Sequence, residues 1–115
     1  MAYTIITCSG VSNTGKLTTQ VGTLLLHRCG DRIDACISAT RPTVVVEEEI
    51  QRAGKILILD GCADCCGKKR LWALGVEPHT HIIATECDIK KNGMAEPRFD
   101  EIERLARVVM EEIRR

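Results

Sequence analysis

Three of the seven cysteines in this chain lie within one short segment, DGCADCC, at residues 60–66. The segment directly follows the apolar run of residues 56–59 and is followed at once by Lys68, Lys69 and Arg70. Thiolates are strong metal ligands and strong nucleophiles. Packing alone rarely requires three cysteines so close together, so we expect the chemistry of this protein to centre on this segment.

The number of cysteines is odd, and no secretion signal is expected, which argues against a disulfide framework. Met1 leads directly into strand-like residues 3–7, without the basic and apolar regions of a signal peptide. The longest apolar runs are far shorter than the roughly 20 residues that a membrane helix needs. We therefore expect a cytoplasmic protein without a membrane partner, in which clustered cysteines indicate metal or redox chemistry.

The overall composition is that of an ordinary globular protein. The 115 residues are 44% hydrophobic and 28% charged, which is enough for one domain spanning residues 1–115 with its own core. The formal net charge is zero and aromatic residues make up only 3%, so nothing favours a nucleic-acid partner.

Strand-like and helix-like segments alternate along the chain. Strands are expected at residues 3–8, 33–38, 55–59 and 79–85, and helices at about residues 14–29, 42–53, 66–74 and 97–114. This alternation predicts an α/β fold, a small three-layer domain with a mostly parallel sheet of three to four strands and helices on both faces. Trp72 is expected on the core face of the third helix.

In an open parallel sheet, ligands bind beyond the carboxyl ends of the strands. Six of the seven cysteines are expected near these ends: Cys8, Cys36, Cys62, Cys65, Cys66 and Cys87. Cys29 should lie at the opposite edge as an apolar filler. His79 and His81 begin the last expected strand, so we expect them to lie far from the cysteine cluster.

The cations after Cys66 also favour an anionic site. Lys68 and Lys69 fall in the first turn of the third expected helix, where each positive charge is unfavourable by about 0.3–1 kcal/mol at low salt. A zinc ion held by four thiolates carries a formal charge of about minus two, and nearby lysines would neutralise it. We therefore expect Lys68 and Lys69 to neutralise the charge of a thiolate site.

Two catalytic interpretations match the sequence less well. Residues 10–17, GVSNTGKL, nearly match a phosphate-binding loop, but Leu17 stands where the hydroxyl ligand for magnesium is needed. A phosphatase-like use of Cys8 as nucleophile needs an arginine six residues later, where Thr14 stands instead.

Two interpretations of the cysteine cluster remain open. Cys62 and Cys65 have the spacing of a redox pair at a helix N-terminus. Cys62 and Cys66 have the spacing of zinc ligands, and the fold would bring Cys8 and Cys36 to them. Four thiolates suit zinc and an iron–sulfur cluster alike.

The sequence resembles the DGC-domain family, named for its central Asp-Gly-Cys. The resemblance rests on Cys8-Ser9-Gly10 followed by Ser12, on the lone Cys36, and on the string Asp60-Gly61-Cys62-x3-Cys66-x-Lys68-Lys69. The family is regarded as zinc-binding through four cysteines. The resemblance therefore implies that Cys8, Cys36, Cys62 and Cys66 are the ligands. Cys65 and Cys87 are then extra thiols.

Three residues of these motifs are expected to support the metal site and not to bind the ion: Gly10, Ser12 and Asp60. Asp60 is expected either to cap the following turn or to accept hydrogen bonds behind the ligands, and Gly61 to allow a tight turn. The sequence analysis thus predicts a zinc-binding protein that handles metal or sulfur. The alternative is a thiol redox or iron–sulfur electron-transfer protein that uses Cys62, Cys65 and Cys66.

Overall fold

The structure is a computed structural model that describes residues 2–115. Its strands are β1 (Tyr3–Thr7), β2 (Ile33–Ser38), β3 (Lys55–Asp60) and β4 (Thr80–Ile83). Its helices are α1 (Asn13–Arg28), α2 (Thr43–Arg52), α3 (Cys66–Ala73), the short 3₁₀ helix η1 (Ala84–Glu86) and α4 (Phe99–Arg114). The elements predicted from the sequence are all present. The last strand is shorter than expected because the chain turns into η1 after Ile83.

The four strands form one parallel sheet in the order β2-β1-β3-β4. The chain first moves from β1 outward to β2, then crosses back over β1 to β3 and continues to β4. The direction of progress therefore reverses between β1 and β3. In open α/β sheets, such a reversal leaves a crevice beyond the carboxyl ends of the two strands, where ligands usually bind.

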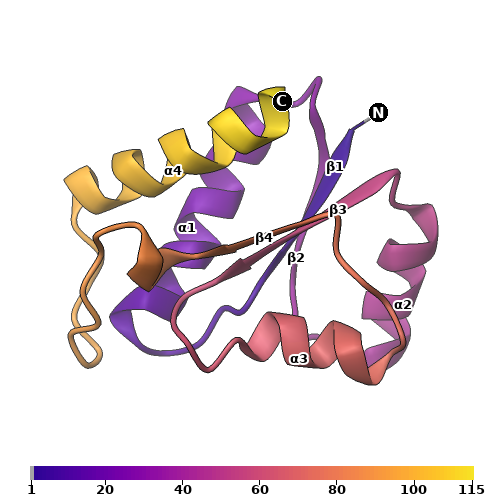
Figure 1. The fold of residues 1–115 in the computed structure, drawn as a ribbon, viewed down its shortest axis with the longest axis horizontal. Helices are drawn as coiled ribbons and strands as arrows, with labels where there is room; N and C mark the ends of the chain where they lie inside the picture. Colours follow the sequence, from indigo (N-terminus) through magenta and orange to yellow (C-terminus); the bar gives the residue numbers. More distant parts are fainter. Residues whose placement is uncertain (1) are drawn as a thin grey trace.

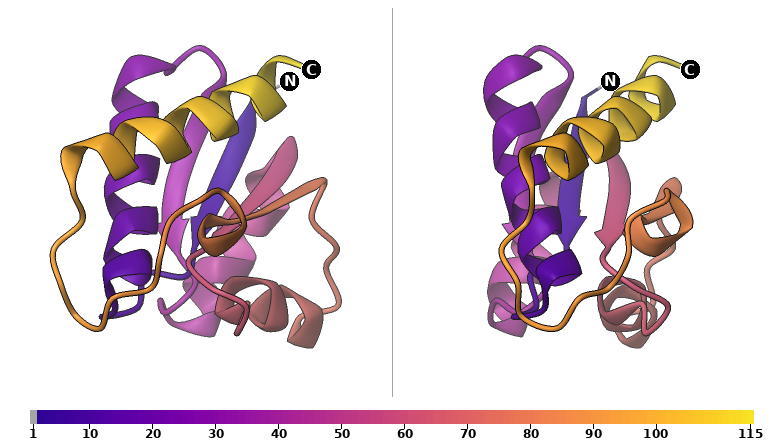
Figure 2. Two further views of the ribbon diagram at one scale, coloured as in Figure 1. Left: turned by 60° about the vertical axis from the view of Figure 1, so that its left-hand side comes forward. Right: turned by 90° about the vertical axis from the view of Figure 1, so that its left-hand side faces the viewer.

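Helices cover both faces of the sheet and make three layers. Helices α1 and α4 pack on one face, and α2 and α3 on the other (Figures 1 and 2). Each face has its own buried cluster: Leu25 and Leu105 belong to the α1/α4 side, and Ile58 and Leu71 to the α2/α3 side. The predicted α/β architecture is thus confirmed. No helix within residues 2–115 combines the length and apolar character needed to cross a membrane.

The prediction that Trp72 packs in the core is wrong. Helix α3 buries Gly67 and Leu71 against the sheet, which leaves Trp72 on the solvent side with 76% of its surface exposed. Helix α3 is only eight residues long and buries a narrow stripe. Its apolar pattern is therefore too short to predict from the sequence which face of the helix packs on the sheet.

One glycine of α1 makes room for a candidate ligand. A Cβ atom at Gly22 would lie 2.4 Å from the sulfur of Cys36 and 3.2 Å from a methyl group of Thr7. Helix α1 can therefore approach β2 this closely only because position 22 has no side chain.

We expect Gly22→Ala to destabilise the protein by about 1–3 kcal/mol through overpacking, although alanine favours a helix. Adding Cys36→Ala should restore most of that loss, because the clashing sulfur is gone. Urea unfolding of the single and double variants measures the coupling. Gly30→Ala is the control, since its Cβ would have no neighbour closer than 3.5 Å. If Gly22→Ala lowers the free energy of unfolding equally in the wild type and in Cys36→Ala, this packing is contradicted.

Candidate metal centre

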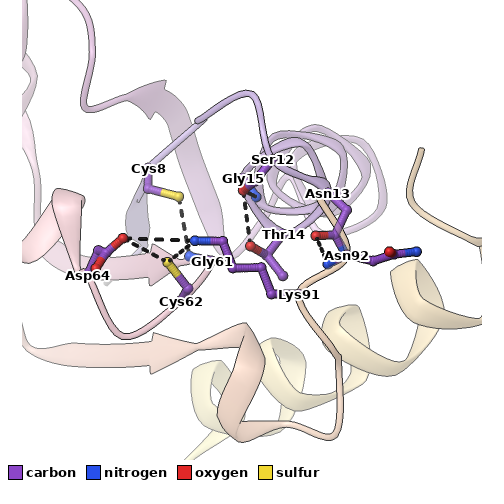
Figure 3. Close-up of polar contacts among 10 residues, drawn as sticks. All are labelled: Cys8, Ser12, Asn13, Thr14, Gly15, Gly61, Cys62, Asp64, Lys91 and Asn92. Carbon is purple, nitrogen blue, oxygen red and sulfur yellow. Dashed lines mark hydrogen bonds and ion pairs between the residues drawn. The ribbon is translucent and has the colours of Figure 1, made fainter. Parts of the chain in front are cut away.

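Cys8 directly follows β1, at the switch point between the carboxyl ends of β1 and β3, the region called the crevice below. The Cys8 backbone N–H donates to the Leu59 carbonyl at 3.1 Å, which extends the pairing of the two strands. Its sulfur accepts a hydrogen bond from the Gly61 N–H at 3.2 Å (Figure 3). The same sulfur lies 3.7 Å from the Thr18 hydroxyl of α1. The bond from Gly61 joins Cys8 directly to the segment that carries Cys62, Cys65 and Cys66.

Gly61 lets the first turn of α1 lie close to the end of β3. A Cβ atom at Gly61 would come within 2.8 Å of the carbonyl carbon of Thr14. From the sequence, we expected Gly61 to allow a tight turn. The structure shows close packing of two backbones instead, and its backbone φ is not positive. Any side chain here would push α1 away from the crevice.

A lysine distant in sequence approaches the sulfur of Cys62. Lys91 Nζ lies 3.6 Å from Cys62 Sγ and 3.9 Å from the Asp64 carboxylate, and Asp64 lies 3.7 Å from the same sulfur (Figure 3). The side chains of Lys68 and Lys69, expected as the neutralising cations, are exposed on α3. Sequence reasoning missed Lys91, because no local pattern connects it with a cysteine 29 residues away.

Lys91 is held in place by Asn13, the first residue of α1. The Asn13 side chain donates to the Lys90 carbonyl at 2.8 Å and accepts from the Asn92 N–H at 2.7 Å, so it pins the loop after η1 over the crevice. The same loop engages Lys16, whose Nζ pairs with Glu96 at 2.8 Å. A phosphate-binding loop needs this lysine for phosphate, so the structure gives the nucleotide interpretation no support.

The two other residues expected to support the site lie at the start of α1. The Ser12 hydroxyl accepts the Gly15 N–H at 3.1 Å and caps the helix. Gly10 packs so tightly under Gly15 that a Cβ on the latter would lie 2.6 Å from the Gly10 backbone. In the structure, both residues shape the β1–α1 connection behind Cys8.

Asp60 organises the turn between β3 and α3. Its carboxylate is fully buried and accepts N–H bonds from Gly67 at 2.7 Å and Lys68 at 3.3 Å. These two amides belong to the first turn of α3, whose own cap position, Cys65, gives no side-chain bond. Asp60 therefore caps the helix, one of the two roles expected from the sequence. The Gly67 N–H is bonded to Oδ1, and Oδ2, which accepts the Lys68 N–H, also lies 2.7 Å from His81 Nε2.

The expectation that His81 lies far from the cluster is wrong. Strand β4 has only four residues and pairs with the last four of β3, so even its second residue, His81, lies near the carboxyl edge. His81 is paired with Ile58, and its ring reaches Asp60. His79 is turned elsewhere: its Nδ1 accepts the Ile56 N–H at 3.0 Å.

Among residues 2–115, one group of three side chains has metal-ligand atoms that all lie within 4.8 Å of one another: Asp60, Cys65 and His81. The four cysteines predicted as ligands do not form such a group within the same residues. Cys8, Cys62 and Cys66 all lie around the crevice, and the set of four stays a prediction.

Cys36 is the outlier among the four predicted ligands. In the sheet, Cys36 is paired with Ile5 of β1, which lies three residues before Cys8. The sulfur of Cys36 packs against Gly22 of α1. Gly22 lies one helical turn, about 6 Å, from Thr18, which contacts Cys8. Two other cysteines have apolar neighbours. Cys29 is buried in the core on the α1/α4 side, as expected, and Cys87 is partly buried and packs against the same core.

Burial and nearby negative charges raise the pKa values of Cys65 and Cys66, the two thiols at the start of α3. The pKa of Cys66 is raised first by desolvation and then by the negative charges of Cys8, Asp60, Asp64 and Cys62. The pKa of Cys65 is raised by desolvation and then by Asp60. A redox or nucleophilic cysteine needs a lowered pKa, whereas mutually repelling thiolates are stabilised by a metal cation. The raised pKa values of Cys65 and Cys66 thus give no sign of an activated nucleophile.

The comparison with protein families identifies the family of the chain. The model of the DGC domain matches residues 4–109, which is nearly the whole chain. The protein therefore belongs to the DGC-domain family. Comparison of this chain with the curated proteins and with the solved structures found no match.

Cys36 allows a test of the burial of a candidate ligand. Burial raises the pKa of its thiol from 9.0 to about 11. Between these two values the unfolded chain loses the proton while the folded chain keeps it. The metal-free protein should therefore lose stability as the pH rises from 9 towards 11, by at most about 2–3 kcal/mol from this group.

Urea unfolding of the wild type and of Cys36→Ala across this pH range measures the contribution. The variant should lose less stability than the wild type over the same interval. Parallel curves for the two proteins would contradict the burial of this thiol.

Proposed function

We propose that this protein binds a zinc ion through Cys8, Cys36, Cys62 and Cys66 at the carboxyl edge of its sheet. Its role would be to handle metal, by holding, transferring or sensing the ion. The observation that carries the proposal is the hydrogen bond from the Gly61 N–H to the sulfur of Cys8 at 3.2 Å. It joins the cysteine after β1 to the turn that follows β3, at the place where a doubly wound sheet binds its ligands.

The chemistry of the surroundings supports a thiolate–metal site. Backbone amides and Lys91 supply positive charge next to Cys8 and Cys62, as an anionic zinc–thiolate centre requires. The four cysteines do not form a close group of ligand atoms within residues 2–115, so sharing one ion would bring their sulfur atoms closer together.

A role in handling metal is favoured over a purely structural role. Both faces of the sheet have apolar cores that do not involve Cys8, Cys62 or Cys66. The fold thus has a source of stability independent of an ion, unlike small zinc domains that are unfolded without metal. Cys66 is exposed, so an ion held there can exchange with partners.

The cytoplasm is the compartment that we propose for this activity. All seven cysteines are free thiols, which a reducing environment preserves. No feature of the composition points to a nucleic-acid partner, and the partner required by the proposal is the metal ion itself.

The proposal predicts that Cys62→Ser and Cys66→Ser each remove the zinc ion from this site. Untagged protein, purified without oxygen, should be analysed for metals and for titratable thiols. The matched control is Cys29→Ala, which removes a cysteine at the far end of α1 and should keep the wild-type metal content. Folding of each variant is checked by circular dichroism.

Less than about 0.2 metal ions per wild-type chain, with every thiol titratable, would contradict the proposal, since a closed zinc site holds one ion. A brown protein containing iron and sulfide would show that the same thiolates carry an iron–sulfur cluster.

A further inference from the structure

The group formed by Asp60, Cys65 and His81 includes none of the four predicted zinc ligands. It joins three elements: Asp60 ends β3, Cys65 precedes α3, and His81 lies in β4. Each contributes one ligand atom, and these atoms lie within 4.8 Å of one another.

The donor atoms are those that zinc uses in proteins. Zinc binds carboxylate oxygen, imidazole nitrogen and thiolate sulfur at about 2.0–2.3 Å, so donors around one ion lie roughly 3–4 Å apart. His81 Nε2 and Asp60 Oδ2 are 2.7 Å apart and already face each other. To share an ion, these two atoms would move slightly apart, and Cys65 Sγ, already within 4.8 Å of both, would be the third donor.

Asp60 is held in place before an ion binds. Its carboxylate is fully buried, and its Oδ1 accepts the Gly67 N–H at 2.7 Å. An ion bound at Oδ2 would leave this bond to Oδ1 in place and would share Oδ2 with the longer Lys68 N–H contact of 3.3 Å. A buried carboxylate whose negative charge is balanced only by hydrogen bonds is stabilised by a nearby cation.

The group opens on a groove at the surface. His81 lines a groove of about 350 Å³ together with Lys68, Trp72 and His79. The groove gives a metal ion a route to His81 and leaves room for a fourth ligand from solvent. Three protein ligands with one open position are typical of zinc sites that exchange a ligand, whereas structural zinc sites are closed by four.

We propose that Asp60, Cys65 and His81 form a second zinc site, with three protein ligands and an open fourth position. When Zn²⁺ binds, the His81 ring proton moves from Nε2 to Nδ1, and the Cys65 thiol proton passes to solvent. The imidazole nitrogen, the carboxylate oxygen and the sulfur then hold the ion. This site and the four-cysteine site share no ligand, so separate variants can remove each of them.

The test is metal loading of the intact chain with Co²⁺ and with Zn²⁺ under anaerobic conditions. The wild type should bind two ions per chain, and His81→Asn and Cys65→Ser should each bind one. Cobalt bound at the second site should give a tetrahedral spectrum with fewer sulfur-to-metal transitions than the four-thiolate site. His27→Asn, which changes an exposed histidine at the far end of α1, should still bind two.

The outcomes separate this site from the proposed function. Loss of one ion in Cys62→Ser, with no loss in His81→Asn or Cys65→Ser, would overturn the second site and leave the first. Loss in His81→Asn and Cys65→Ser alone would support the second site and contradict the four-cysteine site. Asp60 is left unchanged because it caps α3.

A measurement on the wild type covers the case in which a variant fails to fold. In protein labelled with ¹⁵N-histidine, Zn²⁺ should shift the Nε2 resonance of His81 and place the remaining ring proton on Nδ1. No change at His81 when the protein is saturated with Zn²⁺ would overturn the proposal.

Discussion

The buried carboxylate of Asp60 is the interaction on which the arrangement of the cysteines depends. Burying an ionised carboxylate is costly unless hydrogen bonds replace its water. Here the first-turn amides of α3 and the ring of His81 replace it. These bonds join the end of β3 to the start of α3 and to β4. The turn between Gly61 and Cys65 is therefore held at both ends, and its thiols stay at the carboxyl edge.

The second constraint is the close approach of α1 to the crevice. Helix α1 reaches Cys8, Gly61 and Cys36 because the positions that face it are small. Its first residue, Asn13, then holds the loop that presents Lys91 to Cys62. One helix thus sets the spacing of two candidate ligands and the position of a neutralising charge. The same closeness packs the sulfur of Cys36 against Gly22.

The sequence was sufficient for the features that depend on topology. Alternating strands and helices imply a parallel sheet, and a parallel sheet brings the residues after its strands to one edge. Cys8 and the DGC segment could be placed there without coordinates, and Asp60 could be expected to cap the following turn. The family resemblance came from the same residues and is confirmed by the match to residues 4–109.

The features missed from sequence depend on distances between elements. The place of His81 follows from β4 being shorter than expected and from its register with β3. Lys91 reaches Cys62 only because Asn13 anchors a loop about 80 residues further along the chain. Trp72 is exposed because α3 buries a narrow stripe. None of these facts leaves a periodic or motif signal in one sequence.

The central claim is that thiolates from separate strands meet around one metal ion at this edge. X-ray absorption at the zinc edge of Cys65→Ser protein, which keeps all four predicted ligands, tests it most directly. The account predicts a shell of four sulfur atoms at about 2.3 Å from the zinc. A shell made of nitrogen and oxygen atoms at about 2.0–2.1 Å, without four sulfurs, would contradict it.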